Sequence, residues 1–439
     1  MWYNTPMDNG TAKRRSFMAR EVRIGPAGGM RMVLAPCEAE SVAVGVFVAS
    51  GSRHESPATS GISHLIEHML FKGTATRRPI DITREIEGRG GMLNACTGEE
   101  ATCYYAHLPD DFLAEAMEIL SDIYLRATMP EDEFAREKSV VIDEIKMYAD
   151  EPDQVAAENL QRNLFPRSQL GAPVAGTPES LAPLTTRDLK DYVRAHYRPG
   201  NTILAVAGSF DPERAVAIAR RCFGGFRRSQ SAAPQRKRPF GRVVPESIVE
   251  RDVQQAQLAL GYRTFGVSDR RKFAATLLDG VLGRGMMSRL FQELREKKGI
   301  SYDISSRLQL FSDSGMFTVS AGMDPSKAQV ALRTICREIE RLKTRRVSAA
   351  ELKRTKEFLV GNFRLSCEKV TTKLFLYAQS LLSFGRIVEP QEQVDGVLAV
   401  TADDLISTAR EVFDSSRRSV SWVMPRGHAA GCPKPAFAG

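Results

Sequence analysis

The chain has 439 residues, of which 43% are hydrophobic and 26% are charged; these values are ordinary for a globular protein and exclude a fibrous or low-complexity chain. The length predicts two or three domains, and the longest apolar runs, such as residues 42–49, fall short of the ~20 residues of a membrane span, so no membrane partner is expected. The formal net charge is +8, but much of the excess lies in residues 1–20 and 227–242 rather than on one folded face, so no nucleic-acid partner is expected.

The two basic segments divide the chain. Residues 1–20 are predicted to be a flexible tail, and residues 227–242, which read RRSQSAAPQRKRPFGR, are predicted to be a solvated basic linker. The linker separates a first domain, residues 21–226, from a second domain of similar size, residues 243–425. Residues 426–439 are expected to form a second flexible tail.

The first domain alternates predicted strands and helices. In chain order these are strands at 21–24, 30–35 and 42–49, helices starting at 61–63 and at Asp81, a hairpin of 92–95 and 101–108, helices at 111–128 and 131–149, a strand at 201–208 and a helix at 211–222. Asp81 is a typical cap residue, and Gly90 with Gly91 ends the helix that it opens. Pro130 separates the two long helices.

The second domain repeats this plan. Its predicted elements are a strand at 256–262, a helix at 269–282, paired strands at 301–309 and 315–321, helices at 325–343, 349–364, 369–383 and 405–413, and a strand at 419–423. The mixed order with hairpins predicts an α+β protein of two homologous domains, each a mixed, largely antiparallel sheet with helices packed mainly on one face. An internal duplication is plausible from the parallel order, although residue identity between the halves is faint.

The cysteines indicate the compartment. Seven are scattered singly, as Cys37, Cys96, Cys103, Cys222, Cys336, Cys367 and Cys432. None forms a CxxC pair, and a disulfide framework is usually dense and even in number, so a reducing compartment, the cytoplasm, is predicted. The alternative interpretation of residues 1–20 is a transit peptide, which would place the protein in the mitochondrial matrix.

Residues 64–68 read His-Leu-Ile-Glu-His. On a helix, His64 and His68 share a face, so both imidazoles can reach one ion, and Glu67 lies beside it. Two histidines, a third ligand and an open position for water are typical of catalytic zinc, and a nearby carboxylate can take the proton of that water. The expected cofactor is one Zn²⁺ per chain, in a catalytic first domain. The motif is expected by chance about 0.01 times in a chain with six histidines, so two unrelated histidines are the weaker interpretation.

The third ligand must come from elsewhere. The predicted helix 131–149 carries Glu137 and Glu144, two turns apart on one face. Either carboxylate can ligate, and the other then lies close enough to orient a ligand. Spacing alone does not choose between them.

Four stretches identify a family. They are GISHLIEHMLFKG at 61–73, GMLNACTGEEATCYY at 91–105, EKSVVIDEIK at 137–146 and SRLFQELREKKGISY at 288–302. With them the chain resembles the pitrilysin family of inverzincin metallopeptidases over most of residues 20–425. Within it, the chain is similar to the short-chain branch that includes bacterial relatives of the mitochondrial processing peptidase β subunit. Cys96 stands where an aromatic residue is common and Gly98 where Ser is usual, but neither departure removes a group from the metal site.

The resemblance assigns roles in the first domain. It places the ligating Glu about 76 residues after His68, which makes Glu144 the third ligand and Glu137 a supporting acid in catalysis. Asn94 and Ala95 match the edge strand on which the family binds substrate as an added β-strand through main-chain hydrogen bonds.

The resemblance also assigns roles in the second domain. There Arg295 and Tyr302 match a pair that holds substrate and stabilises the tetrahedral oxyanion.

The implied function is zinc-dependent endopeptidase, hydrolysing peptides or unfolded polypeptide segments in a closed chamber. The family's long members contain four homologous domains and this chain two, so a homodimer, or a heterodimer with a related chain, is expected. The alternative is a structural core or adaptor subunit of a larger complex. Relatives of that kind lose zinc ligands, whereas this chain keeps them.

Overall fold

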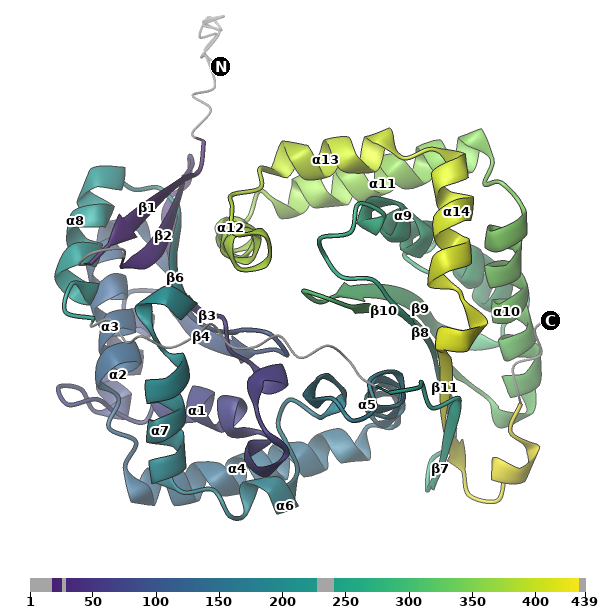
Figure 1. The fold of residues 1–439 in the computed structure, drawn as a ribbon, viewed down its shortest axis with the longest axis horizontal. Helices are drawn as coiled ribbons and strands as arrows, with labels where there is room; N and C mark the ends of the chain where they lie inside the picture. The colour runs from purple at the N-terminus through teal and green to yellow at the C-terminus, as the bar shows by residue number, and fades with distance from the viewer. Residues whose placement is uncertain (1–17, 26–28, 227–240, 434–439) are drawn as a thin grey trace, which may run out of the picture.

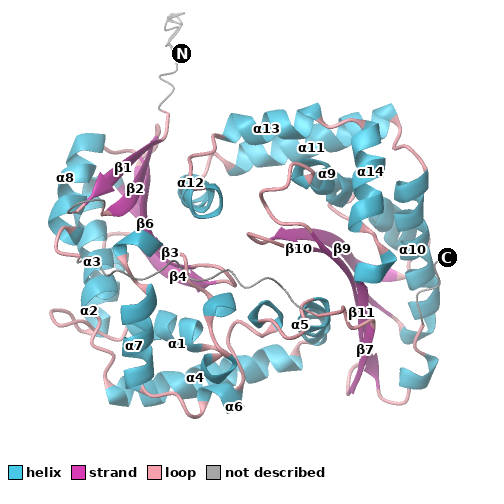
Figure 2. Ribbon diagram, viewed as in Figure 1, coloured by secondary structure: helices cyan, strands magenta, loops and turns pink. Residues whose placement is uncertain are grey.

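The computed structural model describes residues 18–25, 29–226 and 241–433. Most of the tail predicted over 1–20 and of the linker predicted over 227–242 lies outside these residues, as do residues 434–439 of the second tail. The polypeptide forms two halves, each with one mixed sheet and a set of helices (Figures 1 and 2). The α+β prediction is therefore confirmed.

The first sheet has six strands in the order β1-β2-β6-β3-β5-β4. They are β1 (Arg20–Ile24), β2 (Met30–Pro36), β3 (Ser41–Val48), β4 (Met92–Thr97), β5 (Thr102–Pro109) and β6 (Thr202–Gly208). Only β2 and β6 run parallel, and every other pair is antiparallel. Every residue of β6 and nearly every residue of β3 is buried, which explains their continuous apolar sequence.

The first-half helices are α1 (Ile62–Leu70), α2 (Pro79–Glu87), α3 (Leu113–Arg126), α4 (Glu131–Asp150), α5 (Pro152–Leu164), α6 (Pro178–Leu181), α7 (Thr186–His196) and α8 (Pro212–Phe223). Three of them, α5, α6 and α7, were not predicted. The prediction that Asp81 caps α2 is wrong, because the helix begins at Pro79 and the Asp81 carboxylate accepts from the N–H of Arg78 from within the first turn.

The second sheet has five strands in the order β7-β11-β8-β10-β9. They are β7 (Glu246–Arg251), β8 (Ala256–Thr264), β9 (Ser301–Leu310), β10 (Gly315–Met323) and β11 (Arg418–Pro425). Strands β7 and β11 are parallel and the rest antiparallel, so the order and directions repeat those of β2-β6-β3-β5-β4. The two halves therefore share one topology, with β1 as an addition to the first.

The second-half helices are α9 (Lys272–Leu282), α10 (Ala328–Thr344), α11 (Ala349–Ser366), α12 (Val370–Phe384), α13 (Pro390–Ala399) and α14 (Ala402–Val412), with a π-helical turn at Phe291–Glu296. Strand β7, of sequence ESIVER, was not predicted because its residues are mostly polar and only half-buried or exposed.

The two halves exchange one helix each. Helix α12 of the second half packs on β6, β3 and β2, where Leu374 and Ala378 join a buried cluster with Phe47 (Figure 1). Helix α5 of the first half packs in the same way on β8 and β11, where Leu160 joins a cluster with Val423. Each sheet thus has its own helices on one face and a helix of the other half on the second face.

A buried arginine also joins the halves. Arg53 is 2% exposed, and its guanidinium lies 2.6 Å from Glu100 at the turn between β4 and β5 and 2.8 Å from Asp313 at the turn between β9 and β10. The backbone N–H of Ser312 donates to Glu100 as well. The tip of the β4–β5 hairpin is therefore fixed against the second half.

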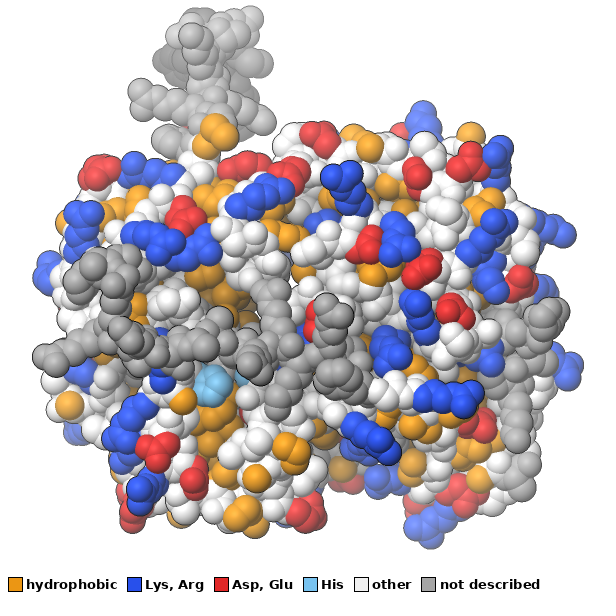
Figure 3. All heavy atoms as spheres, viewed as in Figure 1, with side chains coloured by type: hydrophobic (Ala, Val, Ile, Leu, Met, Phe, Trp, Pro, Cys, Tyr) orange, Lys and Arg blue, Asp and Glu red, His pale blue; other side chains and the backbone are white. Residues whose placement is uncertain are grey.

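The molecular surface carries both signs of charge. On the face shown in Figure 3, Lys and Arg side chains are interspersed with Asp and Glu over both halves. None of the helices in the described part of the chain is long and apolar enough to cross a bilayer.

Candidate metal centre

Helix α1 is held at its amino end by a carboxylate from outside the helix. Glu55 accepts hydrogen bonds from the backbone N–H of Gly61, at 2.7 Å, and of Ser63, at 2.8 Å. Gly61 has φ of 91°, and a Cβ there would lie 2.5 Å from the carbonyl oxygen of Ala175, so only glycine fits. Glu55 is 2% exposed, and this burial raises its pKa to about 7. The first turn of α1, which contains His64, is thus fixed in place.

Helices α1 and α4 bring three donor groups together. The Nε2 atom of His64 lies 3.9 Å from Glu144 Oε2, and that of His68 lies 3.7 Å from the same oxygen. One ligand atom from each residue falls within 4.8 Å of the others. Zinc with bonds of about 2.1 Å in a tetrahedral site separates its donors by about 3.4 Å, so two imidazole nitrogens and one carboxylate oxygen at these distances fit that ion.

The protonation of His64 suits a metal site. Burial, together with the neighbouring His68, lowers the pKa of His64 and so favours its neutral form. A neutral imidazole is the form that binds a metal.

A chain of polar contacts lies behind His68. Its Nδ1 is 3.0 Å from Glu137 Oε2, and the Nζ of Lys72 is 2.7 Å from Glu137 Oε1. Burial alone raises the pKa of Glu137, but the hydrogen bonds from Lys72 and His68 outweigh burial and lower that pKa below its ordinary value. Glu137 is therefore an anion that can orient the imidazole, while Glu144 faces the point where both rings converge. Lys72, which follows the end of α1, was not singled out from the sequence.

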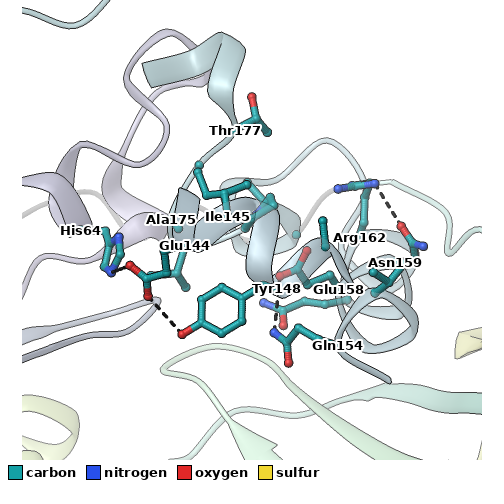
Figure 4. A pocket seen from close by; sticks show the side chains of 18 of the residues that line it. His64, Glu144, Ile145, Tyr148, Gln154, Glu158, Asn159, Arg162, Ala175 and Thr177 are labelled. Carbon is teal, nitrogen blue, oxygen red and sulfur yellow. Dashed lines mark hydrogen bonds and ion pairs between the residues drawn. The ribbon is translucent and has the colours of Figure 1, made fainter. Parts of the chain in front are cut away.

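Tyr148 orients Glu144. Its hydroxyl donates to Glu144 Oε1 at 3.1 Å, which leaves Oε2 toward the two imidazoles. Figure 4 shows the Glu144 carboxylate between His64 on one side and Tyr148 on the other. Tyr148 lies one turn after Glu144 on α4, a spacing that could have indicated the contact.

Glu67 is held by strand β4. The Thr97 hydroxyl donates a short hydrogen bond to Glu67 Oε2. Burial raises the pKa of Glu67, and the bond from Thr97 opposes that rise. The strand predicted here ends at Ala95, but Cys96 and Thr97 belong to β4 and pair with Cys103 and Thr102 of β5. The contact was missed for that reason.

Asn94 and Ala95 lie on the edge strand. In the described part of the chain β4 pairs with β5 alone, so its other side is open. The two residues line a hollow of about 320 Å³ together with Glu67 and His68. The N–H of Ala95 donates to Asn94 Oδ1 at 2.7 Å, so a peptide that pairs there must displace the Asn94 side chain.

A larger cavity of about 760 Å³ opens on the other side of the donor groups. It is lined by His64, Glu67 and Glu144, and by Val249 and Arg251 from β7 of the second half. The cavity is therefore shared between the two halves, with the candidate ligands at one end (Figure 4).

Arg295 and Tyr302 lie together but outside this cavity. The Arg295 guanidinium is 4.3 Å from the centre of the Tyr302 ring, and Tyr302 is 81% exposed. Neither residue is among those that line the cavities beside His64 and His68. The structure brings these two predicted residues to each other and not to the metal centre of their own chain.

Comparison of the sequence with protein families gives two matches. Residues 31–178 match the family described as "Insulinase (Peptidase family M16)", and residues 183–359 match "Peptidase M16 inactive domain". The uncharacterized zinc protease YmxG of Bacillus subtilis is 33% identical over 388 residues, which cover 88% of this chain and 94% of that protein. An uncharacterized zinc protease of Mycobacterium leprae is 33% identical over 407 residues, which cover 92% of this chain and 91% of that protein.

Solved structures share the fold. A protease from Helicobacter pylori superposes with a TM-score of 0.87 at 23% identity, covering 93% of this chain and 100% of that one. A chain of complex III from Candida albicans superposes with a TM-score of 0.81 at 18% identity, covering 92% of this chain and 95% of its own. At such identities the likeness is one of fold alone.

Proposed function

Because this chain belongs to the M16 (insulinase) family of peptidases, we propose that it is a zinc-dependent endopeptidase that hydrolyses peptides or unfolded polypeptide segments in a closed chamber. One observation carries the proposal: His64, His68 and Glu144 converge within 4.8 Å, as the ligands of one Zn²⁺ per chain, with Glu67 beside them in the same cavity. The same observation disfavours a structural core or adaptor subunit, which has no need of a complete donor set.

In the proposed mechanism, His64, His68 and Glu144 would hold the zinc, which when bound would supply Lewis acidity to the scissile carbonyl and to the attacking water. Glu67 takes the proton of that water at Oε1, because Thr97 occupies Oε2. Glu67 then delivers the proton to the leaving amine.

Other residues orient these groups. Glu137 accepts from His68 and keeps its ring in place. Asn94 and Ala95 hold the substrate backbone as an added strand on β4, with its scissile bond over the hollow that Glu67 and His68 line.

The metal is tested directly. Purified protein should hold about one zinc per chain, and a chelator should abolish hydrolysis of an unstructured peptide until zinc is restored. Protein that binds no zinc and cleaves nothing would instead favour the structural-subunit alternative. Hydrolysis that continues in chelated, metal-free protein would contradict the proposal.

The chamber needs a second chain. We propose a homodimer, or a heterodimer with a related chain, in which Arg295 and Tyr302 of one subunit serve the zinc site of the other. The exposure of Tyr302 supports this, as does the lining of the cavity in the same chain, which includes neither Arg295 nor Tyr302. If the partner is a copy, mixing inactive Arg295→Ala and inactive His64→Ala proteins should restore about half the wild-type turnover per mixed dimer, since one chamber carries both defects and the other none. No recovery despite subunit exchange would contradict the homodimer.

The proposed compartment is the cytoplasm, since the seven cysteines are odd in number and scattered singly along the chain, which suits a reducing environment. The transit-peptide alternative concerns residues that lie outside the described part of the chain.

A further inference from the structure

Two thiols face each other on the strand beside the candidate metal centre. Cys96 of β4 and Cys103 of β5 are direct partners across the hairpin, and their sulfur atoms lie 3.1 Å apart. Residues directly opposite in antiparallel strands have Cα atoms about 4.5–5.5 Å apart, inside the range of about 4.4–6.8 Å that disulfides span. We propose that Cys96 and Cys103 form a reversible disulfide when the protein meets a hydroperoxide, and that the oxidised protein hydrolyses peptides more slowly.

The pair differs from the other thiols. All seven cysteines lie in the described part of the chain, and no other two have sulfur atoms in contact there. Five of them are scattered over both halves as half-buried or buried side chains, which suits a packing role. Cys96, in contrast, is exposed on an edge strand, where packing alone gives no reason for a thiol.

A small oxidant can reach Cys96, which is exposed, whereas Cys103 is buried behind it. Cys96 lines the cavity of about 760 Å³ that contains His64 and Glu67. Cys96 and Cys103 together line a second cavity of about 440 Å³ between the first sheet and the second half. Contact with the Cys103 thiol lowers the pKa of Cys96, whereas the hydrogen bond with Cys96, and after it burial, raise the pKa of Cys103. Cys96 is therefore the thiolate that attacks first, since the thiolate is the nucleophile.

The chemistry balances with hydrogen peroxide as the oxidant. The Cys96 thiolate attacks one peroxide oxygen, the S–O bond forms, the O–O bond breaks and hydroxide leaves, to take a proton and become water. The Cys103 sulfur then attacks the sulfenic sulfur of Cys96, the S–S bond forms, the S–O bond breaks and a second water leaves. The two sulfur atoms lose two electrons in total, and the peroxide is reduced to two waters.

The Cys96–Cys103 disulfide affects the candidate metal centre through Thr97, the residue that follows Cys96. Closing 3.1 Å to a disulfide bond of about 2.05 Å moves the sulfur atoms by about 1 Å. Part of that movement passes to β4, because an edge strand is held by one neighbour only. Thr97, which follows Cys96, holds the Glu67 carboxylate. A displacement of about 1 Å near reacting groups can cost up to ~10²-fold in rate, and we expect turnover to fall about 10-fold.

The test treats the zinc-loaded full chain with hydrogen peroxide and measures mass and activity in parallel. Both cysteines lie on one tryptic peptide, residues 90–126, so the disulfide makes it about 2 Da lighter and resistant to alkylation. Turnover of an unstructured peptide should fall about 10-fold, with unchanged zinc content, and a thiol reductant should restore both mass and turnover. The loss of turnover rests on the proposed peptidase function, whereas the mass change does not, so an inactive preparation still tests the disulfide.

Three variants separate this pair from other oxidation. Cys96→Ser should show the same turnover before and after peroxide, although it keeps the exposed Met286 and Met287. In Cys103→Ala the oxidised Cys96 has no partner, so oxidation should run on to sulfinic acid and the reductant should not restore turnover. Cys367→Ala removes a half-buried thiol at the end of α11, and its turnover should fall on peroxide treatment as that of the wild type does.

Two outcomes overturn the proposal. One is a peptide 90–126 that keeps both thiols, or gains oxygen at Cys96 alone, when the wild type is treated with peroxide. The other is a disulfide that forms while turnover stays the same.

Discussion

Replacing Glu67 by Gln separates proton transfer from metal binding. The Glu67 carboxylate is not among the groups that converge on the metal position, and its one short hydrogen bond comes from Thr97. A glutamine has the same shape and can still accept from Thr97, but it cannot take a proton. Zinc content should therefore remain at about one per chain while turnover falls by about 10²–10⁴-fold, the usual contribution of a general base. That loss corresponds to about 2.7–5.4 kcal/mol in the transition state.

The assay measures turnover of an unstructured peptide and zinc content in the same preparation. Glu144→Gln is the matched control, because the same chemical change at a ligand should reduce the affinity for zinc as well as turnover. Thr97→Val keeps Glu67 but removes its donor, and should lower turnover only about 10-fold. If Glu67→Gln lost its zinc, or kept turnover within about threefold of the wild type, the role given to Glu67 would be wrong.

Three further predictions concern the surroundings of the site. Lys72→Met should weaken zinc binding about 10-fold, measured by chelator competition, because Glu137 loses its cation and holds the imidazole less firmly; unchanged affinity would contradict this. Burial raises the pKa of Glu55 from its ordinary value of 4.5 to about 7. Between these two pH values the Glu55 carboxyl is therefore largely protonated in the folded chain and largely ionised in the unfolded chain. The contribution of Glu55 to the stability of the chelated protein should thus be largest below pH 4.5 and fall by up to about 3 kcal/mol as the pH rises to 7, so Glu55→Gln should lack this part of the slope in urea unfolding over that range; equal slopes would refute the assignment. Leu374→Ala in α12 should cost about 2–5 kcal/mol in the free energy of unfolding, while Leu365→Ala, 63% exposed on α11, should cost less than about 0.5 kcal/mol.

The sequence was most informative where local pattern and tertiary role agree. The buried strands β3 and β6 and the long helix α4 follow from apolar runs and helical spacing, and the structure places them within two residues of the predicted bounds. The HxxEH spacing brought His64 and His68 onto one face of α1 because an i, i+4 pair needs no tertiary information.

The missed features depend on contacts between distant segments. Helix α5 begins two residues after α4 ends, so in the sequence the two polar helical patterns run together. The buried face of α5 is determined by the second sheet, against which it packs. The bonds from Glu55 to the start of α1 and from Thr97 to Glu67 join residues whose approach is fixed only once the sheet and α1 have packed. Sequence spacing likewise could not predict that Arg295 and Tyr302 contact each other and lie away from the metal centre of their own chain.

Because α12 of the second half covers the first sheet, one face of that sheet stays uncovered until α12 has been synthesised on the ribosome. Strand β6 completes the first sheet at Gly208, but the helix that covers its second face ends only at Phe384. At ~5–20 residues per second, the interval between them lasts about 10–35 s, during which a wholly apolar sheet face on the nascent chain is bare. We therefore expect the nascent polypeptide to bind chaperones that shield exposed apolar surfaces. A message truncated before α12 should yield aggregates, not a free-standing first domain.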